Sequence, residues 1–141
     1  MYTSLNRQRS DMTIFQKIID KEIPAHIVYE DDKTLAFLDI HPAVPGHTLV
    51  IPKNPAEFVW DLPADDYQAL METSRKLALH IRKTMPQQYV HMSIVGTDVP
   101  HAHVHLIPFD QTVDFHNPER MQAEPDHQAL AEIAKKLQIS S

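Results

Sequence analysis

Three histidines alternate with apolar residues in the segment VPHAHVHLIP, residues 99–108. Side chains on a β-strand point alternately to opposite faces, so His101, His103 and His105 are expected on one face, with the apolar residues on the other. Imidazole has a reference pKa of about 6.5, so a neutral ring nitrogen is free to attack phosphorus near neutral pH. In this interpretation His103 takes a phosphoryl group, while its neighbours offset charge on the oxygens and protonate the leaving group.

The same pattern permits a metal site, since histidines at alternate positions of a strand can bind zinc. Alternate residues lie about 6.6 Å apart, so the backbones of His101 and His105 lie about 13 Å apart, too far for one ion to bind all three rings easily. The chain has no cysteine, and the nearby Asp98 and Asp110 fall in flanking connections. Metal binding and a purely structural role are the weaker interpretations, and no metal or cofactor is predicted.

Composition argues against several other classes of function. The chain has 13 basic and 19 acidic residues, a formal net charge of −6 and no basic cluster, so no nucleic-acid polymer is expected as partner. Its two glycines, Gly46 and Gly96, cannot build a Walker loop or a dinucleotide fingerprint. Apolar stretches fall well short of the roughly 18 residues of a membrane span, and no signal-peptide core begins the chain, so a cytoplasmic protein without a membrane partner is predicted.

The elements that must position the histidines follow from hydrophobic periodicity. A chain of 141 residues predicts one domain, here residues 13–110, after a disordered tail at 1–12 and before an extension at 111–141. Strands are predicted at residues 26–29, 34–40, 47–51, 89–95 and 101–107. Helices are predicted at 14–21, at 64–85 as the long helix, and at 126–138 behind an Asp126 cap. The pattern indicates an α+β fold with a largely antiparallel sheet of about five strands.

The segment His101-Ala-His103-Val-His105-Leu-Ile resembles the pattern of the histidine triad (HIT) superfamily. The resemblance extends upstream to residues 14–53, IFQKIIDKEIPAHIVYEDDKTLAFLDIHPAVPGHTLVIPK, which look like the Hint branch, the histidine triad nucleotide-binding proteins. In all it covers residues 13–108. The resemblance implies a HIT-like fold for residues 13–110 and a homodimer with the long helix and a neighbouring strand at its interface.

The resemblance also implies an enzyme, a nucleotidyl hydrolase that acts on nucleoside 5′-phosphoramidates or related purine nucleotide substrates such as AMP conjugates. His103 matches the family's nucleophile, which forms a covalent nucleotidyl-histidine intermediate. Asp39 matches the acid that binds the ribose hydroxyls. The strand pattern by itself predicts that this carboxylate either contacts a ligand or backbone donor, or caps the following loop. The other matching positions are His101, His105 and His47 around the phosphate, Phe15, Ile18, Phe37 and Ile40 in the base pocket, and Gly96 and Thr97 in the loop before the triad.

The loop before the triad departs from the usual pattern of this branch. Residues 95–100 form a shortened connection, Thr97 stands where glutamine is common, and Asp98 brings negative charge close to the phosphate. Repulsion there is expected to weaken anionic substrates by about 1 kcal/mol at 4 Å in water. Dinucleoside polyphosphate hydrolysis, or nucleotide binding with little or no turnover, therefore stays open as an alternative. Thr13 and Gln16 stand where some relatives carry zinc-binding cysteines, so no structural zinc is expected.

Overall fold

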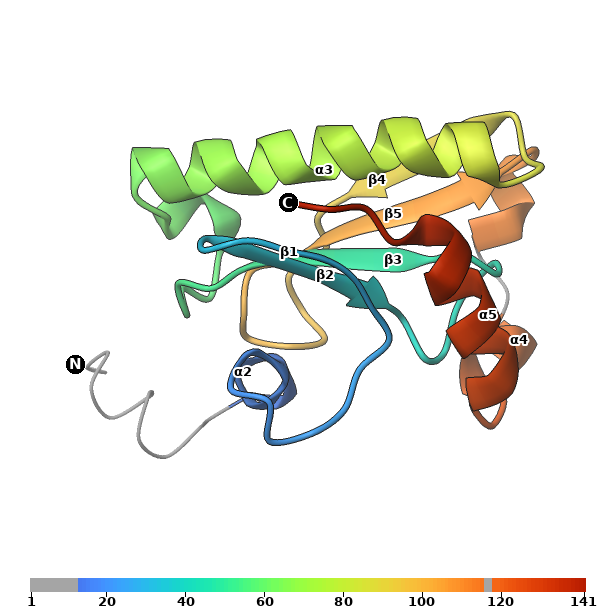
Figure 1. Ribbon diagram of the computed structural model, residues 1–141, viewed down its shortest axis with the longest axis horizontal. Helices are drawn as coiled ribbons and strands as arrows, with labels where there is room; N and C mark the ends of the chain where they lie inside the picture. Colours follow the sequence, from blue (N-terminus) through green and yellow to red (C-terminus); the bar gives the residue numbers. More distant parts are fainter. Residues whose placement is uncertain (1–12, 116–117) are drawn as a thin grey trace.

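Five antiparallel strands form a single sheet in the computed structural model, which describes residues 13–115 and 118–141 (Figure 1). The strand order is β1-β2-β3-β5-β4. The strands are β1 (Ile27–Glu30), β2 (Thr34–Leu38), β3 (Thr48–Pro52), β4 (Tyr89–Ser93) and β5 (Val104–Phe109). This arrangement confirms the predicted α+β class. The predicted tail at residues 1–12 lies outside the described residues.

The long helix α3 (Ala64–Thr84) covers one face of the sheet (Figure 1). Its side chains Leu70, Leu77 and Ile81 are fully buried against strand residues that include Val50 and Leu106. Acidic residues occupy its first turn and basic residues its last, which suits the helix dipole. No helix in the described part of the chain has the length and apolarity needed to cross a bilayer.

The C-terminal segment folds back onto the same face as α3. Helix α5 (His127–Leu137) begins at Asp126, whose side chain accepts a hydrogen bond from the N–H of Ala129. It buries Leu130, Ala134 and Leu137 in the core that α3 forms with the sheet. The short elements between β5 and α5 are the 3-10 helix η2 (Thr112–Phe115) and helix α4 (Pro118–Gln122).

A short helix, α2 (Ile14–Ile19), lies on the opposite face of the sheet (Figure 1). The Thr13 hydroxyl caps it by accepting a hydrogen bond from the N–H of Gln16 at 3.1 Å. Phe15 and Ile18 pack there in a second core cluster with residues of β2 and β3. The loop from β4 to β5 descends on this same side of the sheet (Figure 1). The face covered by α2 is therefore also the face toward which the triad segment is directed.

The strand that carries the histidines is shorter than predicted. It begins at Val104 rather than at residue 101, because the backbone before it pairs with loops and not with β3. The N–H of Ala102 donates to the carbonyl oxygen of Ala56, and the N–H of His101 donates to that of Val99. Only His105 lies within the strand, in register with Leu49 of β3.

Replacing Ile18 with alanine is expected to lower the free energy of unfolding by about 2 to 5 kcal/mol. Ile18 is 6% exposed and its loss leaves a cavity between α2 and the sheet. Ile14→Ala is the matched control on the same helix; because Ile14 is 51% exposed, its replacement should cost no more than about 0.5 kcal/mol. Chemical denaturation measures both values, and equal losses would contradict the assignment of this helix face to the core.

Candidate active site

Four histidines gather at the face of the sheet covered by α2, and all are buried. The exposed fractions are 1% for His101 and His103, 9% for His105 and 2% for His47. The rings of His103 and His105 have centroids 5.0 Å apart, and those of His47 and His105 lie 5.3 Å apart. Phe15 of α2 contacts the rings of His101 and His103 edge-on. The fold thus unites the triad segment with a histidine from the start of β3.

A backbone carbonyl determines which nitrogen of His103 is reactive. Nδ1 of His103 lies 2.7 Å from the carbonyl oxygen of His101. A carbonyl can only accept, so Nδ1 carries the hydrogen and the lone pair of a neutral ring is on Nε2. Nε2 is therefore the nitrogen of His103 that can attack an electrophile.

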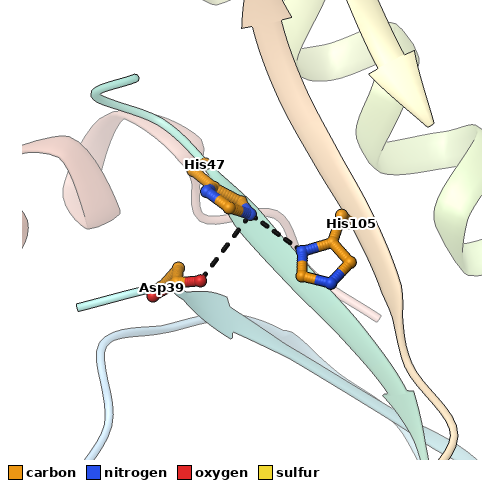
Figure 2. Close-up of side chains that lie close together, drawn as sticks. All are labelled: Asp39, His47 and His105. Atoms are coloured by element: carbon orange, nitrogen blue, oxygen red, sulfur yellow. Dashed lines mark hydrogen bonds and ion pairs between the residues drawn. The ribbon is translucent and has the colours of Figure 1, made fainter. Parts of the chain in front are cut away.

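The N–H of Ala43 determines which nitrogen carries the hydrogen in two further rings, His47 and then His105. Figure 2 shows the contact between these two rings. The N–H of Ala43 donates to Nδ1 of His47 at 3.1 Å, so a neutral His47 carries its hydrogen on Nε2. That nitrogen donates to Nδ1 of His105 at 3.0 Å, which leaves the hydrogen of His105 on Nε2. Nε2 of His105 is buried and has no hydrogen-bond partner in the described part of the chain. His105 thus presents an unused N–H donor, the kind of group that a phosphoryl oxygen accepts from.

Gly46 allows the loop before His47 to approach the end of β5 closely. Its φ is +102°, in the region that glycine favours. A Cβ at this position would lie 3.2 Å from both Met85 Cε and Pro108 Cγ, so a larger residue would push the loop outward. The glycine thereby helps keep His47 within reach of His105.

The ring of His101 fastens the triad segment to β3. Its Nε2 lies 2.8 Å from the carbonyl oxygen of Pro52, so that nitrogen is the donor. Its Nδ1 is then a buried acceptor without a partner among the described residues. His101 thus acts on His103 through its carbonyl, while its own ring holds the backbone in place.

Burial keeps the histidines beside His103 neutral. It lowers the pKa of His47 to about 4, and repulsion from His91 adds to this shift. Burial and repulsion from His47 and His103 lower the pKa of His105 to about 4. Burial also lowers the pKa of His101. Near neutral pH these rings therefore act as directed hydrogen-bonding groups and carry no positive charge.

Asp39 follows the end of β2 and faces His47 (Figure 2). One of its oxygens accepts a hydrogen bond from the N–H of His41 at 2.9 Å, so the carboxylate does cap the following loop. The other oxygen lies 3.7 Å from Nε2 of His47 and is available to a second donor. Burial raises the pKa of Asp39, while the bond from His41 opposes that shift. A ligand hydroxyl at the free oxygen would relieve part of this desolvation cost.

The apolar positions assigned to a base pocket divide into two groups. Phe15, Ile18 and Phe37 are at most 6% exposed and belong to one core cluster, as their residue types alone would predict. Ile40 is 36% exposed and stands at the surface after Asp39. Of these residues, Phe15 reaches the histidine cluster through its ring contacts with His101 and His103.

Asp98 was expected close to the phosphate, but its direct contact with the triad was not predicted. Its Oδ1 lies 3.1 Å from Nε2 of His103, the nitrogen left free by the carbonyl contact. Gly96 lies in the same loop with a φ of +84°, and Thr97 beside it is exposed.

His91 was not predicted as a site residue, because it shares no spacing with the triad. It stacks on Phe115 and lowers the pKa of His47.

Two overlapping sets of side chains have the donor types of a zinc site. They are Asp39, His47 and His105, and Asp98, His103 and His105. Both need His105, and their ligand atoms lie within 4.8 Å of one another, while ligands of tetrahedral zinc lie about 3.4 Å apart. Within the sets the nearest atoms of His47 and His105 lie 3.0 Å apart, those of His47 and Asp39 3.7 Å, and those of His103 and Asp98 3.1 Å, so the spacing is compatible with an ion that would replace the hydrogen bonds made there.

The fold is expected to lose stability as the pH falls from 6.5 toward 4. The folded-state pKa values of His47 and His105 lie below the reference value of 6.5, so in this window the unfolded chain binds protons that the folded chain does not. Each ring contributes a slope of up to about 1.4 kcal/mol per pH unit, and above about pH 6.5 the slope vanishes.

Urea unfolding at a series of pH values measures this slope. His105→Gln keeps a hydrogen-bond donor but cannot titrate. The free energy of unfolding of this variant should therefore change less steeply with pH, by the slope that one histidine contributes. His80→Gln, on α3 and outside the site, should keep the wild-type slope. A His105 variant with an unchanged slope would contradict the assignment.

Comparison with known proteins gives the family of this chain. A family model described as HIT domain matches residues 20–112. An uncharacterized HIT-like protein of Methanocaldococcus jannaschii is 41% identical over 101 residues, which cover 69% of this chain and 78% of that protein.

Solved structures show the same similarity. A HIT-like protein from Bartonella henselae, described as involved in cell-cycle regulation, has a TM-score of 0.75 and 32% identity over 89% of this chain and 93% of its own. A hypothetical histidine triad nucleotide-binding protein from Sulfolobus tokodaii has a TM-score of 0.74 and 27% identity, with 87% of each chain covered. A HIT family hydrolase from Legionella pneumophila has a TM-score of 0.60 and 32% identity over 70% of this chain and 93% of its own.

The matched residues include the whole histidine segment and all of β5, which overlaps it. Four buried histidines with directed protons, on a five-stranded antiparallel sheet, thus coincide with the region on which the family is defined. This chain belongs to the HIT domain family.

Proposed function

We propose that this protein is a nucleotide hydrolase of the histidine triad nucleotide-binding branch, cleaving nucleoside 5′-phosphoramidates or related nucleotide conjugates through a nucleotidyl intermediate on His103. The observation that carries the proposal is the tautomer of His103: with Nδ1 bonded to the His101 carbonyl, the lone pair of the neutral ring is on Nε2. Next to it, the unpartnered N–H of His105 supplies a donor for a phosphoryl oxygen.

The chemical step balances with the groups present. Nε2 of His103 forms a bond to the α-phosphorus, and the bond from phosphorus to the amine nitrogen breaks. The proton held in the resting contact between Nε2 and Asp98 passes to the departing amine, which leaves Nε2 free to form its bond to phosphorus. Water then cleaves the bond from phosphorus to Nε2, which releases the nucleoside monophosphate and restores the histidine. No metal takes part in these steps.

The nucleoside is proposed to lie between the second core cluster and Asp39. The free oxygen of Asp39 would accept a hydrogen bond from a ribose hydroxyl, and burial makes that bond valuable. A purine would pack against Phe15, Ile18, Phe37 and Ile40, with Gly96 and Thr97 near the phosphate and leaving group. Phe15, Ile18 and Phe37 are closely packed in the free protein, so we expect side-chain movement when the base binds.

The contact between Asp98 and His103 also favours a second candidate, a nucleotide-binding module with little turnover. The carboxylate lies where the phosphoryl group must approach Nε2. If it does not move aside, a nucleotide can bind through Asp39 without reaching the nucleophile. A third candidate, hydrolysis of dinucleoside polyphosphates, shares the nucleophile and differs only in the leaving group.

Replacing His103 with alanine is expected to reduce hydrolysis of AMP phosphoramidate by at least about a thousandfold, because the nucleophile itself is removed. Binding of AMP should remain, since its ribose contact is to Asp39. Release of AMP measures turnover, and mass spectrometry of the quenched wild-type protein should detect an acid-labile AMP adduct on His103.

His80→Ala on α3 is the control and should retain wild-type turnover. Hydrolysis that persists in the His103 variant would exclude this nucleophile. AMP binding by the wild type without adduct or product would instead support the binding module. Faster cleavage of diadenosine polyphosphates than of phosphoramidates would favour the third candidate.

We also propose that two copies of the chain associate through β4 and α3. β4 is an edge strand, with one row of backbone groups unpaired within the described sheet. Its region exposes apolar side chains that are costly to leave in water: Tyr89, Met92, Ile94 and Val95, with Tyr67 and Leu79 on the adjacent helix. A second copy that pairs edge to edge would cover both features at once.

Met92→Lys is expected to convert this dimer to monomers, because it places a charge within the buried seam. Met92 is 41% exposed in the single chain. Ile14→Lys on α2, at a position 51% exposed and on the face of the sheet opposite α3 (Figure 1), should leave the dimer intact. Sedimentation velocity distinguishes the two masses; a wild-type protein that sediments as a monomer at all concentrations would refute the dimer.

A further inference from the structure

Asp98 contacts the attacking atom of His103 directly. Its Oδ1 lies 3.1 Å from Nε2, the ring is fully buried, and the carboxylate side chain is 56% exposed. Because Nδ1 already donates to the His101 carbonyl, a neutral ring would direct a lone pair at a carboxylate, and two acceptors repel. The contact is favourable only when one proton lies between Nε2 and the carboxylate.

The position of Asp98 coincides with the path of the leaving group. In displacement at phosphorus the attacking and leaving atoms lie in line on opposite sides of it. The ring of His103 is enclosed by protein, whereas Asp98 is the exposed group toward which Nε2 points. A phosphoryl group that displaces the carboxylate from Nε2 therefore directs its leaving group toward the solvent side, where the loop still holds Asp98.

Among the described residues, Asp98 forms no ion pair with a lysine or arginine, and its recorded partner is His103. In the described part of the chain, the hydrogen bonds and ion pairs of the four site histidines go to other histidines, to carboxylates and to backbone groups. His47, His101 and His105 are neutral because they are buried. Asp39 adds a second carboxylate on the far side of His47. The leaving group thus enters a field that favours positive charge.

We propose that Asp98 selects the leaving group, favouring amines that carry an additional positive charge and disfavouring polyanionic groups such as a second phosphate chain. This rests on the proposed hydrolase function and names its substrate class, nucleotide conjugates of cationic amines. Two unit charges about 4 Å apart in water alter an equilibrium by roughly fivefold. Changing the sign of the charge on a flexible leaving group should therefore change kcat/KM by about tenfold or more.

The test uses AMP phosphoramidates of 1,3-diaminopropane, butylamine and 4-aminobutanoate, whose amines share one linker and end in a positive, a neutral and a negative group. For the wild type, kcat/KM should fall in that order, with about tenfold between the extremes, and added salt should narrow the range. Asp98→Asn keeps the side-chain shape and removes the charge, so its kcat/KM should be nearly the same for all three substrates. Asp98→Ser provides a second neutral variant.

Asp32→Asn in the turn between β1 and β2 is the matched control, because it removes one exposed carboxylate outside the site and should keep the wild-type order. Dividing each wild-type value by that of Asp98→Asn cancels differences in the intrinsic reactivity of the amines. Thermal unfolding of each variant confirms that it is folded.

Three results would overturn the proposal, and they differ from failure of the hydrolase function. Equal wild-type values for the three substrates would show that the charge at Asp98 does not reach the leaving group. An order that persists in both neutral variants would assign selection to another residue. Equal acceleration of all three substrates by Asp98→Asn would show that Asp98 only covers Nε2. Absence of any turnover by the wild type would refute the hydrolase function and, with it, this proposal.

Discussion

The hydrogen bond from Nδ1 of His103 to the carbonyl oxygen of His101 determines which atom of the triad can act on a substrate. A backbone carbonyl cannot donate a proton, so the tautomer does not depend on any side chain that could rotate away. It requires residues 101–103 to be extended, and two contacts hold them so: Ala102 to the backbone of Ala56 and the His101 ring to that of Pro52. The backbone of a loop and of a strand therefore determines which nitrogen of His103 carries the hydrogen.

The same principle extends to the other pair of histidines. The N–H of Ala43 orients His47, and His47 orients His105, so a single backbone donor controls two rings. Burial makes this control effective, because it removes the competing water and keeps both rings neutral. The cost is one buried donor on His105 and one buried acceptor on His101 without partners in the described part of the chain. Such unpaired groups are expensive in a core and are typical of a site that meets a ligand.

Asp98 belongs to a different part of the fold from the other site residues. The histidines lie in or beside the sheet, whereas Asp98 lies in the exposed loop from β4 to β5, where Gly96 adopts a positive φ. Loops tolerate sequence change without loss of the core, so specificity can vary there while the nucleophile is preserved. The proposed division of labour follows: the sheet orients the imidazoles, and the loop decides which leaving group is accepted.

The sequence predicted the α+β class, the five strands, the long helix and the C-terminal helix, because each depends on local periodicity and on prolines that end segments. It also pointed to the histidine segment, since three imidazoles at alternate positions have no simple role in a core. It predicted that the histidine strand begins at residue 101, whereas the strand begins at Val104. The sequence could not show this, because the pairing of Ala102 with Ala56 joins distant segments.

Contacts between distant segments were decided by tertiary structure alone. Nε2 of His26 and Nδ1 of His127 lie 2.9 Å apart although the residues are 101 positions apart in the chain, and no spacing in the chain indicates such a pair. The same holds for the contact of Asp98 with Nε2 of His103, which depends on how the loop turns at Gly96. Residue types and their alternation thus determined which chemistry the chain can perform. The three-dimensional fold decided which nitrogen performs it and which charge faces it, because proton position and electrostatic field depend on through-space distances.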